Sequence, residues 1–183
     1  MIGEGKNMNR LMENGLLNEV IYGDNFAYTF NDKSMFSTTE YKILQDQMNN
    51  LFVKCMKILC NGKIQIYYMT EEYKMLKDVL FSVDEKNFIT IVINLLSAVL
   101  EVKNNGFLTC QNIDAGINHI YIHPSTYKIS LIYLPSGKKI FQNGAEFENE
   151  LRTGLVDAIQ KVPALSTSKI AELSFDLSNR MLS

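Results

Sequence analysis

The sequence has no excess of charge of either sign, and this absence excludes one class of partner. Its 183 residues include 18 Lys and Arg against 20 Asp and Glu, which gives a formal net charge of −2 at pH 7. No basic run is longer than the pair Lys138-Lys139. Because nucleic-acid binding depends on clustered cations that neutralise phosphates, we expect no nucleic-acid partner.

Residues that bind metals are also scarce. The three cysteines, Cys55, Cys60 and Cys110, form neither an even disulfide framework nor a zinc-type spacing, so we expect three reduced, partly buried thiols. The two histidines, His119 and His123, are four residues apart on one expected strand, which separates them by about 13 Å. That distance is too large for shared coordination, so no metal-binding residues are predicted.

The sequence also lacks a long hydrophobic run. The longest apolar segment, residues 88–100, is interrupted by Thr90, Asn94 and Ser97 and is shorter than the ~20 residues that span a bilayer as a helix. The first 15 residues have no apolar core of signal-peptide length. We therefore expect a cytoplasmic protein without direct membrane insertion.

What the sequence does contain is typical of a folded domain. Hydrophobic residues make up 46% of the chain and charged residues 21%, enough for the core of one medium domain or two small lobes. Two turn signals, Gly23-Asp24-Asn25 and Asn61-Gly62, each separate two β-rich runs. Between these hairpins, Ser37 or Thr38 can cap a helix from Thr39 to about Asn49. The expected order is strand (19–22), strand (26–30), helix, strand (51–58) and strand (63–69).

The second half of the chain is expected to be mainly helical. Asp84 can cap a helix that ends at Asn104-Asn105-Gly106 and is apolar around nearly its whole circumference, which predicts that other elements surround it. A β-hairpin follows over residues 119–134. Two more amphipathic helices are expected, at 146–162 and from Ser166 or Ser168 onward.

Two segments give this order a family resemblance. IQIYYMTEEYKMLKDVL resembles the last N-lobe strand, the hinge and the first C-lobe helix of a protein kinase. FITIVINLLSAVLEVKNNGFL followed by NHIYIHPSTYKISLIYLP resembles the central helix and catalytic-loop hairpin. The chain is more similar still to a bacterial kinase-like domain of unknown function that precedes forkhead-associated (FHA) domains in low-GC Gram-positive bacteria. It is similar, more distantly, to the pseudokinase-like domain of the type VII secretion component EssB.

The resemblance implies an α+β, protein-kinase-like (pseudokinase) fold with two lobes. Residues 1–69 would form a reduced N-lobe, a small antiparallel sheet plus one helix. Residues 70–183 would form a helical C-lobe that contains the hairpin 119–134.

The residues needed for phosphoryl transfer are not at the positions where the resemblance would place them. The strand 26–30 has no lysine, and Lys33 lies beyond its end. Glu40 falls at the place of the helix glutamate, but without that lysine we expect no ion pair and a surface acid in the first helical turn. No strand can precede Gly3-Glu4-Gly5-Lys6, so these residues are not predicted to form a phosphate-binding loop.

The metal-binding positions are also substituted. Asp114 falls near the catalytic aspartate, but Asn112-Ile113 stand in place of the expected His-Arg. His119 replaces the metal-binding asparagine, and Tyr133 replaces the metal-binding aspartate of the next loop. A tyrosine is neutral at pH 7 and does not bind magnesium. We therefore predict no catalytic, cofactor-binding or metal-binding residues, and no cofactor.

The sequence-based prediction is a non-catalytic pseudokinase-like domain for protein–protein interaction, acting as an adaptor, scaffold or regulatory module. The resembling families imply an FHA-linked signalling assembly or a secretion assembly at the cell envelope. The expected partners are proteins of unknown identity, with a homo-oligomer as an open possibility. The alternative is a divergent nucleotide-binding or phosphotransfer enzyme.

Overall fold

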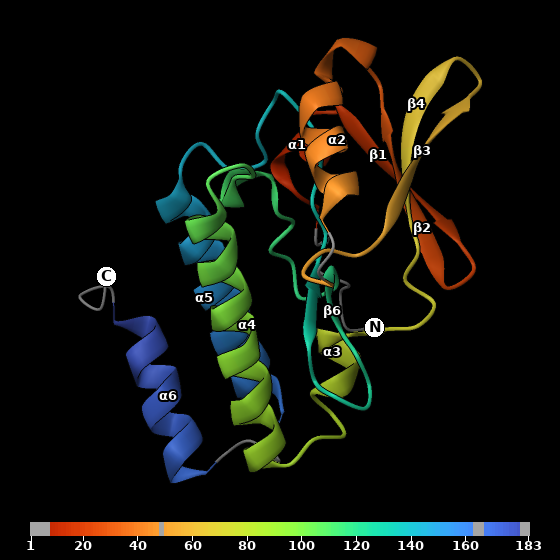
Figure 1. Ribbon diagram of the computed structural model, residues 1–183. Helices are drawn as coiled ribbons and strands as arrows, with labels where there is room; N and C mark the ends of the chain where they lie inside the picture. Colours follow the sequence, from red (N-terminus) through yellow and green to blue (C-terminus); the bar gives the residue numbers. More distant parts are fainter. Residues whose placement is uncertain (1–7, 48–49, 163–166, 180–183) are drawn as a thin grey trace.

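The computed structural model describes residues 8–47, 50–162 and 167–179 and shows a mixed α+β protein (Figure 1). An antiparallel four-stranded sheet has the order β1-β2-β4-β3. Its strands are β1 (Leu17–Tyr22), β2 (Asn25–Phe30), β3 (Cys55–Cys60) and β4 (Lys63–Tyr68). A short helix, α1 (Arg10–Glu13), precedes the sheet.

Both hairpins of this sheet form at the expected turns. Tyr22 pairs with Asn25 around Gly23-Asp24, and Cys60 pairs with Lys63 around Asn61-Gly62. Asn61 and Gly62 have φ angles of 48° and 74°. Positive φ at both central residues is what a two-residue turn needs to match the twist of its strands.

The helix between the hairpins, α2 (Thr38–Asp46), is capped by Ser37, whose hydroxyl accepts a hydrogen bond from the Glu40 amide. A 3₁₀ turn, η1 (Lys33–Met35), precedes it. The helix ends before the expected Asn49, and β3 begins at Cys55 instead of Leu51. The reason is that residues 51–53 bond to the second sheet: Leu131 N donates to Leu51 O (2.8 Å), and Val53 N donates to Leu131 O (3.0 Å).

The second sheet contains the predicted hairpin 119–134. It has the order β5-β6-β7, with β5 (Lys74–Met75), β6 (Ile120–Ile122) and β7 (Ile129–Leu131). All six residues of β6 and β7 are buried. The helix α3 (Leu76–Val79) continues directly from β5, and the 3₁₀ turn η2 (Cys110–Asn112) comes before β6.

The long helix α4 (Glu85–Asn105) begins and ends as expected. The Asp84 side chain accepts from Asn87 N, and Gly106 ends the helix in the left-handed conformation (φ 72°). However, the prediction that other elements surround α4 is wrong. One face packs into the core through residues such as Phe88, whereas three aliphatic side chains on another face are 43–58% exposed: Ile93, Leu96 and Leu100.

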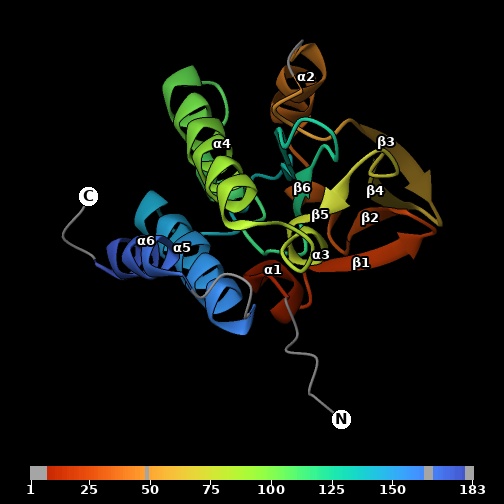
Figure 2. The ribbon, with the colours of Figure 1, turned by 90° about the horizontal axis from the view of Figure 1, so that it is seen from below.

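The last two helices are α5 (Gly144–Lys161), capped by Asn143, and α6 (Ser168–Ser178), capped by Thr167. Figures 1 and 2 show α4, α5 and α6 on one side of the molecule, the four-stranded sheet on the other, and β6 between them. Within the described residues, no helix is long and apolar enough to cross a membrane. The rejected phosphate loop at 3–6 and the possible helix start at Ser166 lie outside the described residues.

Candidate functional site

A buried polar cluster lies where the four-stranded sheet meets the rest of the chain. Four side chains form it: Glu19 from β1, Tyr28 from β2, Asp114 from the segment after η2, and His119 from the residue before β6. Tyr28 is 0% exposed, Asp114 4% and His119 5%. Asp114 and His119 are two of the residues that the sequence placed at kinase catalytic and metal-binding positions. The structure brings them together, although the two histidines stay apart at opposite ends of β6.

Both carboxylate oxygens of Asp114 already have partners. Oδ2 accepts hydrogen bonds from the Tyr28 hydroxyl (2.6 Å) and from Asn9 Nδ2 (2.9 Å). Oδ1 accepts from Gly116 N (3.1 Å) and lies 3.4 Å from His119 Nδ1. Burial alone would raise the pKa of Asp114, but the His119 cation and these donors outweigh it and hold the pKa well below its usual range.

His119 is held as a cation between two carboxylates. Its Nε2 lies 2.7 Å from Glu19 Oε1, and its Nδ1 faces Asp114. Burial alone would lower the pKa of His119, but the charges of Asp114 and Glu19 raise it to about 10. At neutral pH the imidazole is therefore protonated and has no lone pair with which to accept a proton.

The chemistry open to this cluster is limited by these contacts. A general base needs a free lone pair within reach of the proton that it removes. Asp114 has no oxygen without a donor, and His119 has no unprotonated nitrogen. Burial, followed by the Asp114 charge, also raises the pKa of Tyr28 well above its usual value, so the phenol stays neutral. The arrangement is that of a structural ion pair.

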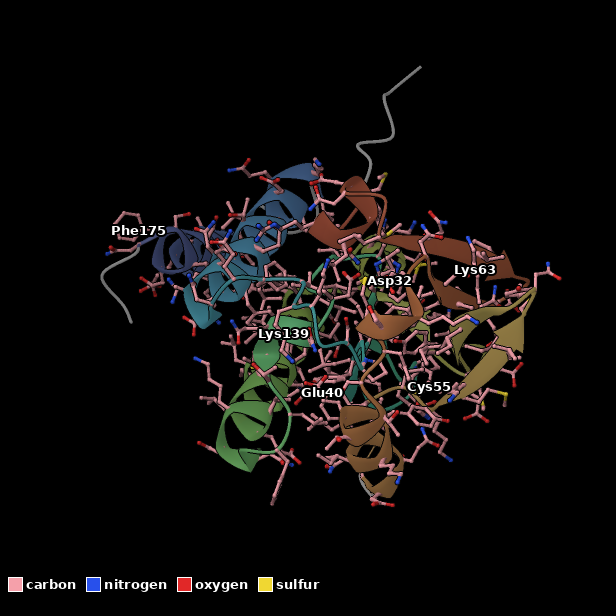
Figure 3. The ribbon with its side chains drawn as sticks, turned by 90° about the horizontal axis from the view of Figure 1, so that it is seen from above. Asp32, Glu40, Cys55, Lys63, Lys139 and Phe175 are labelled. Atoms are coloured by element: carbon pink, nitrogen blue, oxygen red, sulfur yellow. The ribbon has the colours of Figure 1, made fainter. Side chains whose placement is uncertain are left out.

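A second polar cluster joins α2 to the segment that follows β7. Glu40 forms an ion pair with Lys139 and accepts a hydrogen bond from Asn112 Nδ2 (2.9 Å). Asn112 Nδ2 also donates to Ser136 O (2.8 Å), and both residues are fully buried. Figure 3 shows Glu40 on α2 and Lys139 close together. The expectation of a surface acid without an ion pair is therefore wrong, because the partner comes from a distant segment.

Two further residues were singled out from the resemblance to kinases, Tyr133 and Lys33. Tyr133 is 1% exposed, and its main-chain oxygen accepts from the Tyr68 hydroxyl (2.8 Å). Burial raises the pKa of the Tyr133 phenol, so it stays neutral. Lys33 is exposed in η1, beyond the end of β2. Across the described part of the chain, no group of three His, Cys, Asp or Glu side chains could hold a metal ion.

The sequence did not reveal an exposed apolar surface on α4, which we call the α4 stripe: Ile93, Leu96 and Leu100. These side chains are 58%, 43% and 56% exposed. Their spacing of three and four residues places them on one face of the helix. The near-circumferential apolar pattern contained this signal, but core and interface residues look alike in a sequence.

Comparison with known proteins adds no family assignment. No protein-family model matches the sequence, and no curated protein matches it. The functional conclusion therefore rests on the two polar clusters and the α4 stripe.

Proposed function

We propose that this chain is a non-catalytic, kinase-like domain for protein–protein interaction, acting as an adaptor, scaffold or regulatory module. The observation that carries the proposal is the Asp114 carboxylate, whose two oxygens accept hydrogen bonds from Tyr28, Asn9 and Gly116 and face the His119 imidazole. Near the position that the resemblance gives to the catalytic aspartate of a kinase, this chain has a buried ion pair.

The element order supports the kinase-like part of the proposal. A hairpin, a helix and a second hairpin build one antiparallel sheet, and the long helix α4 then leads to the buried hairpin of β6 and β7. The resemblance would make β2 the strand of the anchoring lysine, but β2 has no lysine, and the hydroxyl of its Tyr28 donates to Asp114 Oδ2 (2.6 Å). The basic side chain that contacts Glu40 is Lys139, which comes from the segment after β7.

The α4 stripe supports the interaction part. Burying one aliphatic side chain of this size gains about 1.5–3 kcal/mol, so three on consecutive turns favour a partner. Proteins expose single apolar residues routinely, but a contiguous row along a helix is typical of a helix-docking surface. We place this surface in a cytoplasmic assembly of the FHA-linked or secretion-associated kind that the resemblance implies.

A thermal-shift assay with ATP and either Mg²⁺ or Mn²⁺ separates this proposal from the enzyme alternative. A ligand at 100 times its Kd adds about 2.7 kcal/mol of stability, which is easily measured as a rise in Tm. We expect no rise at millimolar nucleotide. A rise that depends on the metal ion would favour the divergent nucleotide-binding or phosphotransfer enzyme.

Photo-crosslinking in the native cell tests the interaction surface. A benzophenone amino acid at position 96 should give a discrete adduct with one protein, because Leu96 lies within the α4 stripe. The matched control is position 172 on α6, where Glu172 is also exposed. No adduct at position 96, or equal adducts at both positions, would contradict an interface on α4. An adduct of twice the chain mass would identify the partner as a second copy.

A further inference from the structure

The four-stranded sheet has two edge strands, β1 and β3, and the hairpin turns fix which main-chain groups point outward. A two-residue turn makes the residues that flank it a hydrogen-bonded pair, and such pairs alternate along the strands. Tyr22 and Asn25 flank the first turn, so every second residue back from Tyr22 bonds to β2. The bond from Asn31 N to Leu16 O (3.1 Å) fits this alternation. The N–H and C=O groups of Glu19 and Ile21 therefore point away from the sheet.

The β3 edge has the same geometry, but α2 covers it. Cys60 and Lys63 flank the second turn, so Cys55, Lys57 and Leu59 have outward main-chain groups. Gln45 Nε2 donates to Cys55 O (3.0 Å), and Lys57 N donates to the Tyr41 hydroxyl (3.1 Å). These side chains of α2 prevent another strand from pairing there.

Within residues 8–47, 50–162 and 167–179, no side chain covers the β1 edge in this way. Among the described residues, no group bonds to the outward main-chain atoms of Glu19 or Ile21. The Ile21 side chain is 65% exposed and that of Tyr22 42%. Figure 2 shows β1 as the outermost strand of its sheet. Edge groups in this state are a template for pairing with another strand.

A groove of about 1040 Å³ extends from β1 to the segment around β5, and Glu19 and Ile21 line it. Carboxylates outnumber ammonium groups in its lining, with Glu19, Asp24, Glu71 and Asp78 against Lys74 and Lys77. The His119–Asp114 pair behind Glu19 is neutral as a unit. This balance disfavours a polyphosphate and favours a basic ligand. Met12, Tyr73 and Met75 supply apolar surface in the same groove.

We propose that β1 binds an extended peptide segment of a partner protein, in which Lys or Arg alternates with aliphatic residues, as an added strand beside Glu19 and Ile21. Main-chain hydrogen bonds would supply affinity, and the acidic groove would select basic side chains, as in other strand-addition interfaces. This inference deepens the proposed interaction function and rests on it.

The probe is a fluorescein-labelled hexapeptide, acetyl-Val-Lys-Val-Lys-Val-Lys-amide, titrated by fluorescence polarisation. Two control peptides separate charge from main-chain pairing: one replaces each Lys with Glu, and the other keeps the side chains but N-methylates alternate amides. We expect saturable binding of the basic peptide and at least about tenfold weaker binding of both controls. Equal binding of the N-methylated peptide would overturn strand addition, and no saturable binding at millimolar peptide would overturn the proposal.

Two proline variants form a matched pair on the protein. Ile21 and Leu59 are equivalent positions, each one residue before the closing pair of its hairpin, with an outward amide and an exposed side chain. Proline is tolerated there because the lost N–H makes no bond within the sheet. Ile21→Pro should weaken binding of the basic peptide by about three- to tenfold, whereas Leu59→Pro should leave it unchanged. Equal losses in both variants would overturn the assignment to β1.

Amide hydrogen exchange gives a readout that needs no substitution. The amides of Glu19 and Ile21 should exchange rapidly in the free protein and become protected when the peptide binds. Protection without peptide that increases with protein concentration would show a second copy on the β1 edge and overturn the peptide assignment. Protection of these amides in the monomer without peptide would show that another part of the chain already covers the β1 edge, and it would also overturn the proposal. The photo-crosslinking experiment tests α4 and not β1. If the peptide does not bind at β1, only the strand-addition proposal is overturned, and the proposed interaction function is still decided by the result at α4.

Discussion

At the scale of single residues, buried polar contacts of Asp114 and His119 join the first half of the chain to the second. The resemblance to kinases would place Asp114 near the catalytic aspartate, which needs an oxygen free to accept a proton. Instead Tyr28, Asn9, Gly116 and His119 surround it. A buried charge that is surrounded by donors contributes to the stability of the fold. This contribution can be measured from the dependence of the free energy of unfolding on pH.

The His119 ion pair should make stability depend on pH. The pKa of His119 is about 10 in the folded chain, above the ordinary value near 6.5. Between these two pH values the folded state therefore binds more protons than the unfolded state. This contribution is complete below pH ~6.5 and is lost as the pH rises toward 10. Urea unfolding should show a loss of as much as about 2 kcal/mol between pH 7 and 9. A His119→Gln variant should lose this dependence, and an unchanged slope would contradict the ion pair.

Asp114 and His119 should also be energetically coupled. Removing His119 leaves the buried Asp114 charge with neutral donors only, and removing Asp114 leaves the buried His119 cation with Glu19 alone, so each change costs up to about 3–5 kcal/mol. Asp114→Asn and His119→Gln should each destabilise the protein by an amount in this range. The double variant should lose clearly less than the sum of the two, because the attraction between the two charges is then lost only once. Additive losses in a double-mutant cycle would show that the two side chains act independently.

At the scale of elements, the informative feature is that α4 presents two apolar faces with different roles. Leu95 and Leu96 are adjacent in the sequence, yet Leu95 is 0% exposed and Leu96 is 43% exposed. The first belongs to the core and the second to the α4 stripe. A substitution at each position therefore measures a different property of the same helix.

Leu95→Ala should lower the free energy of unfolding by about 2–5 kcal/mol, because it opens a cavity in the core. Leu96→Ala should change it by about 0.5 kcal/mol or less, since an exposed leucine leaves no cavity. Urea denaturation of the two variants measures the difference. A large loss in Leu96→Ala would mean that the α4 stripe is part of the core of the free protein.

The elements that were predicted correctly from the sequence are those determined by residues close to one another in the chain. The turn Asn61-Gly62 and the cap Asp84 act within a few residues, and both formed as expected. What sequence reasoning missed depends on partners far along the chain. Glu40 and Lys139 are 99 residues apart, and Asn9 and Asp114 are 105 apart. No periodicity records such pairings, nor does it show which face of α4 stays uncovered.

At the scale of the whole molecule, contacts between the first and second halves are numerous and buried. The Tyr68 hydroxyl donates to Tyr133 O, Ser37 N donates to Pro135 O (2.9 Å), and residues 51–53 bond to β7. The buried apolar side chains of both halves form one core cluster. A division at residue 69, which remains a prediction from the sequence, would cut through this cluster.

We therefore expect the chain to unfold in one cooperative transition. The sequence has nine tyrosines and no tryptophan, so tyrosine fluorescence reports tertiary packing while far-UV circular dichroism reports secondary structure. The two unfolding curves in urea should coincide. Two separated transitions, or a stable fold in a fragment of residues 1–69, would show that the halves are independent.

The two edges of the four-stranded sheet differ, because α2 covers β3 and not β1. This difference limits how many molecules can join through strand addition. A sheet open on both sides could add strands without limit and grow into a fibre. Here Gln45 and Tyr41 occupy two of the three outward positions of β3, so β1 of one molecule cannot dock on β3 of the next. Pairing of β1 with β1 of a second molecule therefore ends after one event, because the combined sheet then has covered β3 strands at both edges. Because side chains of α2 cover β3, this sheet can accept an added strand at one edge, β1, and not at the other.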